Sequence, residues 1–194
     1  MTGMPSAVEL SAYIALCAVG LLAANLLLGL LMAAGYNPAR HWPNRAVKLF
    51  RLHNWTGYIA LGAAIVHPAI LLFSSSPRFR LIDLLLPFWS PVQPFSNVLG
   101  AIALYIVIVV VATSYLRRSL GRQRWRTIHY STYAAAIIFF VHGLIADPTV
   151  TGRAIDYIDG EKVYIEICTA AFILLAIWRI RHRRANRRAE LVRG

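Results

Sequence analysis

Four histidines lie inside apolar stretches of this 194-residue chain, in two pairs of nearly equal spacing. His53 and His67 are 14 residues apart in RLHNWTGYIALGAAIVHPAILL, and His129 and His142 are 13 apart in WRTIHYSTYAAAIIFFVHGL. Imidazole binds several transition metals, and ionisable side chains are costly inside a membrane, where they tend to mark function. The two pairs therefore predict metal or proton chemistry inside an apolar bundle.

The first pair fits one face of an α-helix. A separation of 14 residues corresponds to a rise of about 21 Å and an angular offset of about 40°, so His53 and His67 point to nearly the same side. The residues between them on that side are Gly57, Ala60 and Ala64. This stripe predicts two ligand-type side chains separated by a groove with little side-chain volume.

The second pair does not fit an ideal helix as simply. Thirteen residues turn a regular α-helix by about 220°, so His129 and His142 would face different sides. Either this helix is distorted, or two metal centres meet it from different directions.

Composition places these segments in a membrane. Hydrophobic residues make up 58% of the chain and charged residues only 14%, whereas soluble domains average about a quarter charged. The sequence predicts an all-α integral membrane bundle in which residues 1–194 form a single transmembrane domain. The segment 74–95 is apolar but contains three prolines, so we expect it to be interfacial or re-entrant. The five expected spans are 10–34, 52–73, 98–116, 127–146 and 163–178.

The net charge of +12 is explained by the loops and the tail. Basic residues cluster in the 35–48 loop, at 117–126 and after Arg179, and such clusters mark the cytoplasmic side of membrane proteins. This predicts an outside N-terminus and a cytoplasmic C-terminus in a bacterial-type inner (plasma) membrane. Nucleic acid is excluded as a partner, because no soluble basic fold remains once the spans are removed.

The position of the two paired-histidine spans predicts how the histidines combine. Spans two and four are separated by one span, so they run parallel. His53 is then level with His129 near the cytoplasm, and His67 with His142 near the outside. Zinc prefers a tighter cluster with cysteine or carboxylate ligands, whereas two separated imidazole pairs suit two haem irons stacked between these spans. The haems would be non-covalent b-type groups, because no Cys-x-x-Cys-His sequence occurs.

The segments RLHNWTGYIALGAAIVHP and RWRTIHYSTYAAAIIFFVHG resemble the ferric reductase-like transmembrane domain. This family includes ferric reductases, the membrane part of NADPH oxidases and the haem subunit of the periplasmic methionine-sulfoxide reductase. The resemblance implies that the four histidines are the ligands of two b-type haems. Ferric reductases and NADPH oxidases continue into a flavin and nicotinamide domain, whereas about 16 residues follow the last expected span here. The sulfoxide-reductase subunit usually lacks the histidine equivalent to His53.

These observations predict transmembrane electron transfer by an oxidoreductase component. The donor would be a cytoplasmic flavoprotein reductase or a membrane quinol, and the acceptor an extracytoplasmic molecule or reductase subunit. Arg51 and Arg126 are candidate partners of the propionates of the cytoplasmic haem; a bound flavin is compatible with the sequence but not indicated by it. One alternative is the haem subunit of a two-component periplasmic reductase. Another is a histidine-dependent proton relay or transporter, for which Glu166 is the candidate acidic partner within a span.

Overall fold

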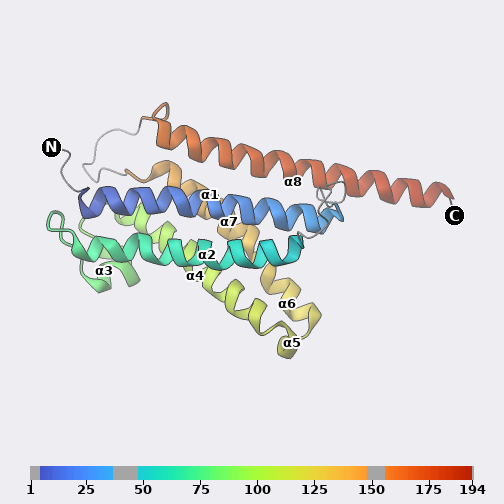
Figure 1. Cartoon of the computed structure of the whole chain (residues 1–194), viewed down its shortest axis with the longest axis horizontal. Helices are drawn as coiled ribbons and strands as arrows, with labels where there is room; N and C mark the ends of the chain where they lie inside the picture. The colour runs from blue at the N-terminus through green and yellow to red at the C-terminus, as the bar shows by residue number, and fades with distance from the viewer. Residues whose placement is uncertain (1–4, 37–47, 148–155, 194) are drawn as a thin grey trace.

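The computed structural model describes residues 5–36, 48–147 and 156–193 of the chain, and every regular element in those ranges is a helix. Figure 1 shows long helices lying side by side, with α8 extending beyond the others. The long elements are α1 (Ala7–Ala34), α2 (Leu49–Ile70), α4 (Pro94–Tyr115), α6 (Arg122–His129), α7 (Ser131–Ile145) and α8 (Gly160–Arg193). The short ones are η2 (Leu71–Phe73), α3 (Leu81–Leu85), η3 (Pro87–Trp89) and α5 (Arg117–Leu120).

Five helical stretches are long and apolar enough to cross a membrane, as the sequence predicted. Between 6% and 22% of the residues in their apolar windows are buried inside the protein, so most of their surface is left for lipid. The fifth helix does not end near Trp178 as expected but continues to Arg193. The five stretches cover 7–34, 49–73, 94–115, 122–145 and 160–182.

Local signals set the ends of α1. The Ser6 hydroxyl accepts a hydrogen bond from the Glu9 amide at 3.2 Å, and the Glu9 carboxylate accepts one from the Ser6 amide at 2.7 Å. This reciprocal capping satisfies amides that have no partner within the helix. At the other end Gly35 adopts a φ of 72°, a left-handed conformation that favours glycine.

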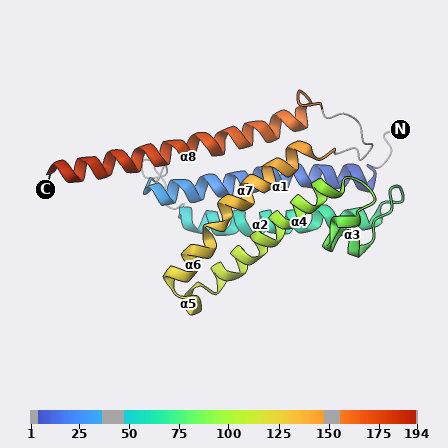
Figure 2. The same cartoon turned by 180° about the vertical axis from the view of Figure 1, so that it is seen from behind.

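The packed core lies between α1, α7 and α8. Val19 and Leu30 of α1 pack with Phe140 of α7 and with Ile165 and Phe172 of α8, and all five side chains are buried. Helix α2 packs along α1, and α4 packs along α7, as both views of the chain show (Figure 2). Helix α2 is fully described and only its Ala60 is buried, so the other side chains of this helix are at least partly exposed.

The fourth span consists of two helices. Helix α6 ends at His129, Tyr130 forms a turn and α7 begins at Ser131. At this break the Ser131 hydroxyl donates to the carbonyl of Ile128 at 2.7 Å, and the Thr132 hydroxyl donates to the carbonyl of His129 at 2.8 Å. Such side-chain bonds to the backbone bend helices. The 13-residue spacing allowed either a distorted helix or two centres that meet a regular helix from different directions, and the structure shows a distorted helix.

The segment 74–93, here named the capping segment, folds against α4. The Tyr105 hydroxyl of α4 donates to the carbonyl of Leu85, and the Asn97 amide donates to the Ser90 hydroxyl at 2.8 Å. Leu85 is 49% exposed and Trp89 78% exposed, which suits contact with lipid or the membrane interface. The capping segment contains only short helical elements and none of span length.

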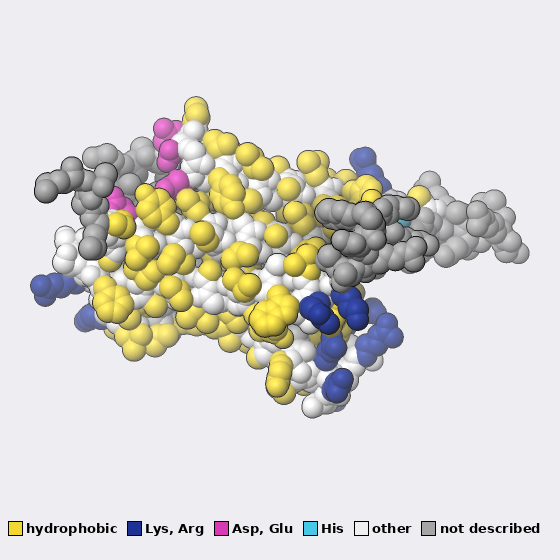
Figure 3. All heavy atoms as spheres, viewed as in Figure 1, with side chains coloured by type: hydrophobic (Ala, Val, Ile, Leu, Met, Phe, Trp, Pro, Cys, Tyr) yellow, Lys and Arg dark blue, Asp and Glu magenta, His cyan; other side chains and the backbone are white. Residues whose placement is uncertain are grey.

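The acidic side chains gather at one end of the molecule and most of the described arginines at the other, although the capping segment adds Arg78 and Arg80 to the acidic end (Figure 3). The acidic end carries Glu9, Asp159 and Glu161, and it also contains the capping segment. The arginine end carries α5 and α6, which hold the five exposed arginines of 117–126. The first described residues of α1 and the end of α8 lie at opposite ends of the bundle, as an odd number of spans requires (Figure 1).

Candidate functional site

His53 of α2 and His129 of α6 lie together near the arginine end and are named the inner pair. Their ring centroids are 6.3 Å apart, and their ring planes meet at 76°. The histidines that sequence reasoning placed at one level therefore face each other across two different helices.

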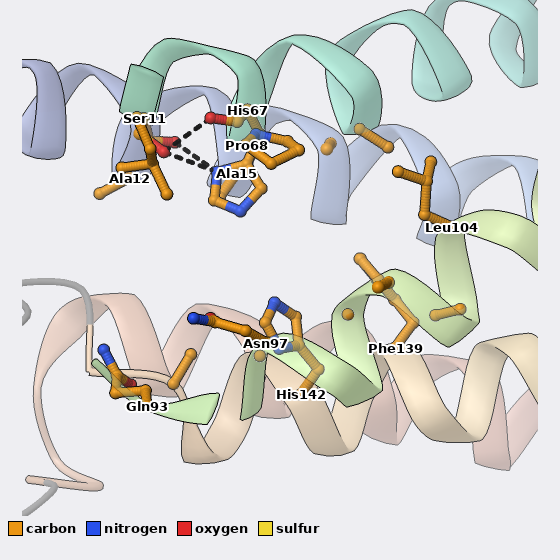
Figure 4. A pocket seen from close by; sticks show the side chains of 18 of the residues that line it. Ser11, Ala12, Ala15, His67, Pro68, Gln93, Asn97, Leu104, Phe139 and His142 are labelled. Carbon is orange, nitrogen blue, oxygen red and sulfur yellow. Dashed lines mark hydrogen bonds between the residues drawn. The ribbon is translucent and has the colours of Figure 1, made fainter. Parts of the chain in front are cut away.

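His67 of α2 and His142 of α7 form the outer pair, near the acidic end. Both line one cavity, and Figure 4 shows their imidazoles pointing into it from opposite sides. The cavity is bounded by residues of α1, α2, α4, α7, α8 and the capping segment, among them Ser11, Ala64, Asp83, Gln93, Asn97, Gly100, Phe139, Asp147, Glu161 and Lys162.

Helix α1 orients both histidines of α2 in the same way. His53 Nδ1 lies 3.1 Å from the carbonyl oxygen of Asn25, and His67 Nδ1 lies 3.0 Å from the carbonyl oxygen of Ser11. A carbonyl only accepts, so Nδ1 carries the proton and donates, which leaves the lone pair on Nε2. Asn25 and Ser11 are 14 residues apart on α1, like the histidines on antiparallel α2. This is the tautomer and support that a metal-ligating imidazole needs.

His142 receives the equivalent support from α4. Its Nδ1 donates to the carbonyl of Ser96 at 2.8 Å, and the Ser96 hydroxyl lies 3.1 Å from the same nitrogen. A Cβ on Gly100, one turn further along α4, would come within 2.9 Å of the His142 Cε1. The imidazole therefore lies against bare backbone, with its Nε2 directed away from Ser96.

His129 is held differently. Its Nδ1 is buried and has no hydrogen-bond partner in the described part of the chain. Instead the Trp125 ring stacks on the imidazole at 5.1 Å and 26°, and the Trp125 indole N–H donates to the Ser114 hydroxyl at 3.2 Å. Stacking therefore fixes the plane of the His129 ring while leaving its tautomer undetermined by the protein.

The spacing of the inner pair fits two axial ligands of one metal ion. A metal–imidazole bond of about 2.0–2.1 Å, with about 1.1 Å from nitrogen to ring centre, places two opposed imidazole centroids about 6 Å apart. The observed separation is 6.3 Å. Among the described residues no group of three or more His, Cys, Asp or Glu could hold a metal ion. Two protein ligands per centre suit an iron whose other four ligands come from a porphyrin.

Residues 15–140, more than half of the chain, match the family described as ferric reductase like transmembrane component. The chain belongs to this family. The matched stretch includes His53, His67 and His129 and ends two residues before His142. Searches among curated proteins and among solved structures returned no match. Ferric reductase-like domains generally bind haem and carry electrons across membranes. The match therefore confirms the expected membrane domain and, in general terms, transmembrane electron transfer.

The two arginines that the sequence suggested as propionate partners are both exposed in this ferric reductase-like chain. Arg51 lies two residues before His53 in α2, and Arg126 lies three residues before His129 in α6. The Arg126 guanidinium lies over the Tyr130 ring, 5.8 Å from its centroid. Both arginines are thus within one helical turn of an inner histidine.

The small residues between the α2 histidines have a different role from the expected groove. A Cβ on Gly57 would come within 3.1 Å of the Asn25 side-chain nitrogen, and Ala60 is fully buried. These two residues therefore let α1 approach α2 closely, and only Ala64 of the stripe lines the outer cavity.

Sequence reasoning missed the residues that support the histidines. The signal for Ser11 and Asn25 was present, since they are polar residues in an apolar run with the same 14-residue spacing as the histidines they bind. Ser96 and Gly100 carried no comparable signal, because only the packing of α4 on α7 brings them to His142. Lys162, a cavity-lining cation at the start of α8, was also missed.

Proposed function

We propose that this ferric reductase-like protein carries electrons across the membrane through two b-type haems. His53 and His129 would hold one haem, and His67 and His142 the other. The observation that carries the proposal is the meeting of the histidines in two level pairs: the inner pair has the spacing of two axial ligands, and the outer pair lines one cavity. His53, His67 and His142 also have the Nδ1 support that suits a ligand. Haem supplies a one-electron iron couple, while the protein supplies ligands, orientation and a low dielectric.

The separation of the two levels supports a transmembrane path. His53 and His67 are 14 residues apart on α2, which corresponds to a rise of about 21 Å. This distance spans most of a hydrocarbon core of about 30 Å. One centre near each membrane surface can exchange electrons with partners on both sides.

Charge supports the direction of transfer. With the arginine end in the cytoplasm, as basic loops favour, the donor is a cytoplasmic flavoprotein or a membrane quinol, and the acceptor meets the acidic end outside. Arg51 and Arg126 would then pair with the propionates of the inner haem. The proposed location is a bacterial-type inner membrane.

The proton-relay alternative finds less support. Glu166, its candidate acidic partner, is exposed on α8 and does not line the outer cavity. The second alternative, a haem subunit of a periplasmic reductase, usually lacks the histidine at the position of His53. Here Asn25 holds His53 through the backbone carbonyl, and its side-chain amide donates to the His53 carbonyl at 2.5 Å. These bonds to Asn25 support the proposal that His53 is a haem ligand.

Haem stoichiometry tests the proposal. Pyridine haemochrome and protein assays on one purified sample should give about two haems per chain. His182→Ala is the matched control, because this histidine stacks on Trp178 in α8 and belongs to neither pair, and it should leave the ratio unchanged. A ratio near one would remove one pair from the proposal, and a ratio near zero would end it.

A further inference from the structure

A buried lysine lies at the outer cavity. Lys162 is only 4% exposed although it belongs to the most strongly hydrated side chains, and lysines are almost never buried without a partner. It is the only Lys or Arg among the described residues that line the cavity, where His67 and His142 are also found. The chain has two lysines among its 20 basic residues, so an ammonium at this place is unusual for this sequence.

The ammonium of Lys162 is aimed at the end of α7. Its Nζ donates to the carbonyl of Gly143 at 2.8 Å and to the carbonyl of Ala146. Carbonyls at a helix C-terminus lack amide partners and favour a nearby cation. These bonds use two of the three ammonium donors and hold the charge within one turn of His142.

A cofactor in this cavity brings its own negative charge. Haem b carries two propionates, and this cavity is already lined by Asp83, Asp147 and Glu161, so a further carboxylate there is costly unless a cation pairs with it. Arg51 and Arg126, the cations expected to pair with the inner haem, are within one helical turn of His53 and His129, and neither lines the outer cavity. The outer site therefore needs a cation of its own.

We propose that Lys162 is the counter-charge for a propionate of the haem held between His67 and His142. This inference rests on the proposed function. Lys162 would thus have two roles. It caps the C-terminal carbonyls of α7, which carries His142, and it neutralises a propionate of the haem that His142 would bind. Its charge also favours the reduced haem, which carries one positive charge fewer than the oxidised form.

The test compares Lys162→Met, which removes the charge, with Lys162→Arg, which keeps it. Redox titrations followed by visible absorption give the midpoint potential of each haem, and the outer haem is the one that His67→Ala removes. In Lys162→Met samples that retain two haems, the outer midpoint potential should fall and the inner one stay unchanged. Lys162→Arg should be close to wild type. Arg78→Met, which removes an exposed charge of the capping segment, is the matched control and should move neither potential.

A purely structural role gives a different result. If Lys162 only closes α7, Lys162→Met lowers the melting temperature while both potentials of the two-haem protein stay unchanged, which would overturn the inference. Loss of the outer haem in Lys162→Met but not in Lys162→Arg supports it, and loss in both contradicts it. If Lys162→Met does not fold, Lys162→Gln provides the same uncharged comparison. Failure of the proposed function is separate, because the wild-type chain would then lack two haems.

Discussion

The imidazole of His142 lies directly against the backbone of Gly100. A Cβ built on Gly100 would be 2.9 Å from the His142 Cε1 and 3.0 Å from its Nε2. Carbon atoms in contact prefer separations of about 3.5–4.0 Å, so any side chain at this position must displace the ring. The ring cannot simply retreat, because its Nδ1 is anchored to the carbonyl of Ser96 on the same helix.

Gly100→Ala should therefore remove the outer haem. The added methyl group occupies the place of the imidazole, and overpacking of this kind costs about 1–3 kcal/mol. We expect the haem-to-protein ratio to fall from about two to about one, with the spectrum of the inner centre retained. Pyridine haemochrome assay of the purified variant measures this ratio.

Gly62→Ala is the matched control for this variant. Gly62 is also a helical glycine, and a Cβ there would meet no atom of the described chain within 4 Å. Alanine is the better helix former by about 1 kcal/mol, so this variant should keep both haems and be at least as stable as wild type. Two haems in Gly100→Ala would refute the role given to Gly100.

Replacing either histidine of one level should remove the same haem. His67→Ala and His142→Ala are expected to lose the same haem, because both imidazoles line the outer cavity. His53→Ala and His129→Ala should lose the other one, because their rings lie 6.3 Å apart. Redox titration and visible spectra distinguish the remaining centre. If His67→Ala and His129→Ala abolish the same centre, the pairing is wrong.

The sequence predicted the helices and the pairing because both follow from periodicity. Apolar runs of about 20 residues fix the number of spans, and the order of the spans makes spans two and four parallel. The level pairing of His53 with His129 then needs no knowledge of side-chain packing. These features could be predicted because they depend only on spacing along the chain and on the order of the spans.

What the sequence did not reveal depends on contacts between helices. The break at Tyr130 lies where the hydroxyls of Ser131 and Thr132 donate hydrogen bonds to carbonyls of the preceding turn. A Ser-Thr pair inside a span is compatible with this outcome but also with an unbroken helix. Similarly, Gly57 was expected to line a groove between His53 and His67, because one sequence does not show which helix approaches a glycine.

The capping segment should loosen in acid. The Arg80 amide donates to the Asp83 carboxylate at 2.8 Å and the Arg80 guanidinium donates at 3.2 Å, so these bonds lower the pKa of Asp83 below its usual value. A depressed carboxyl pKa adds stability above the unfolded value of about 3.9, and this contribution is lost as the pH falls through the folded pKa. Amide hydrogen exchange of 81–89, corrected for intrinsic rates, should therefore show lower protection below about pH 4.

Asp83→Asn provides the comparison for that measurement. This variant should show reduced protection of 81–89 already at neutral pH and a weaker dependence on acid. Protection in the core of α7 should be similar in both proteins, because Phe140 packs against α1 and α8 rather than the capping segment. Equal acid sensitivity in wild type and Asp83→Asn would assign the loosening to another group.

If the donor is a cytoplasmic flavoprotein, we expect it to dock at the arginine end. Arg117 lies 4.9 Å from the Phe50 ring centroid and Arg126 lies over Tyr130, so both take part in local packing. Arg118, Arg122 and Arg124 are exposed on α5 and α6, close in sequence to His129. These three are therefore the arginines to reverse when docking is tested without disturbing the fold.

Replacing Arg118, Arg122 and Arg124 by Glu should slow reduction of the inner haem by an acidic flavoprotein. Charges at the rim of an interface mainly accelerate encounter, and salt screens them over about 10 Å at 0.1 M. Stopped-flow traces should thus differ most from wild type at low salt and converge as salt rises, after insertion has been shown to be unchanged. Arginines that only set topology or bind anionic lipid predict equal rates at every salt concentration. Equal rates with the flavoprotein, together with rapid reduction by a quinol, would place the donor in the membrane.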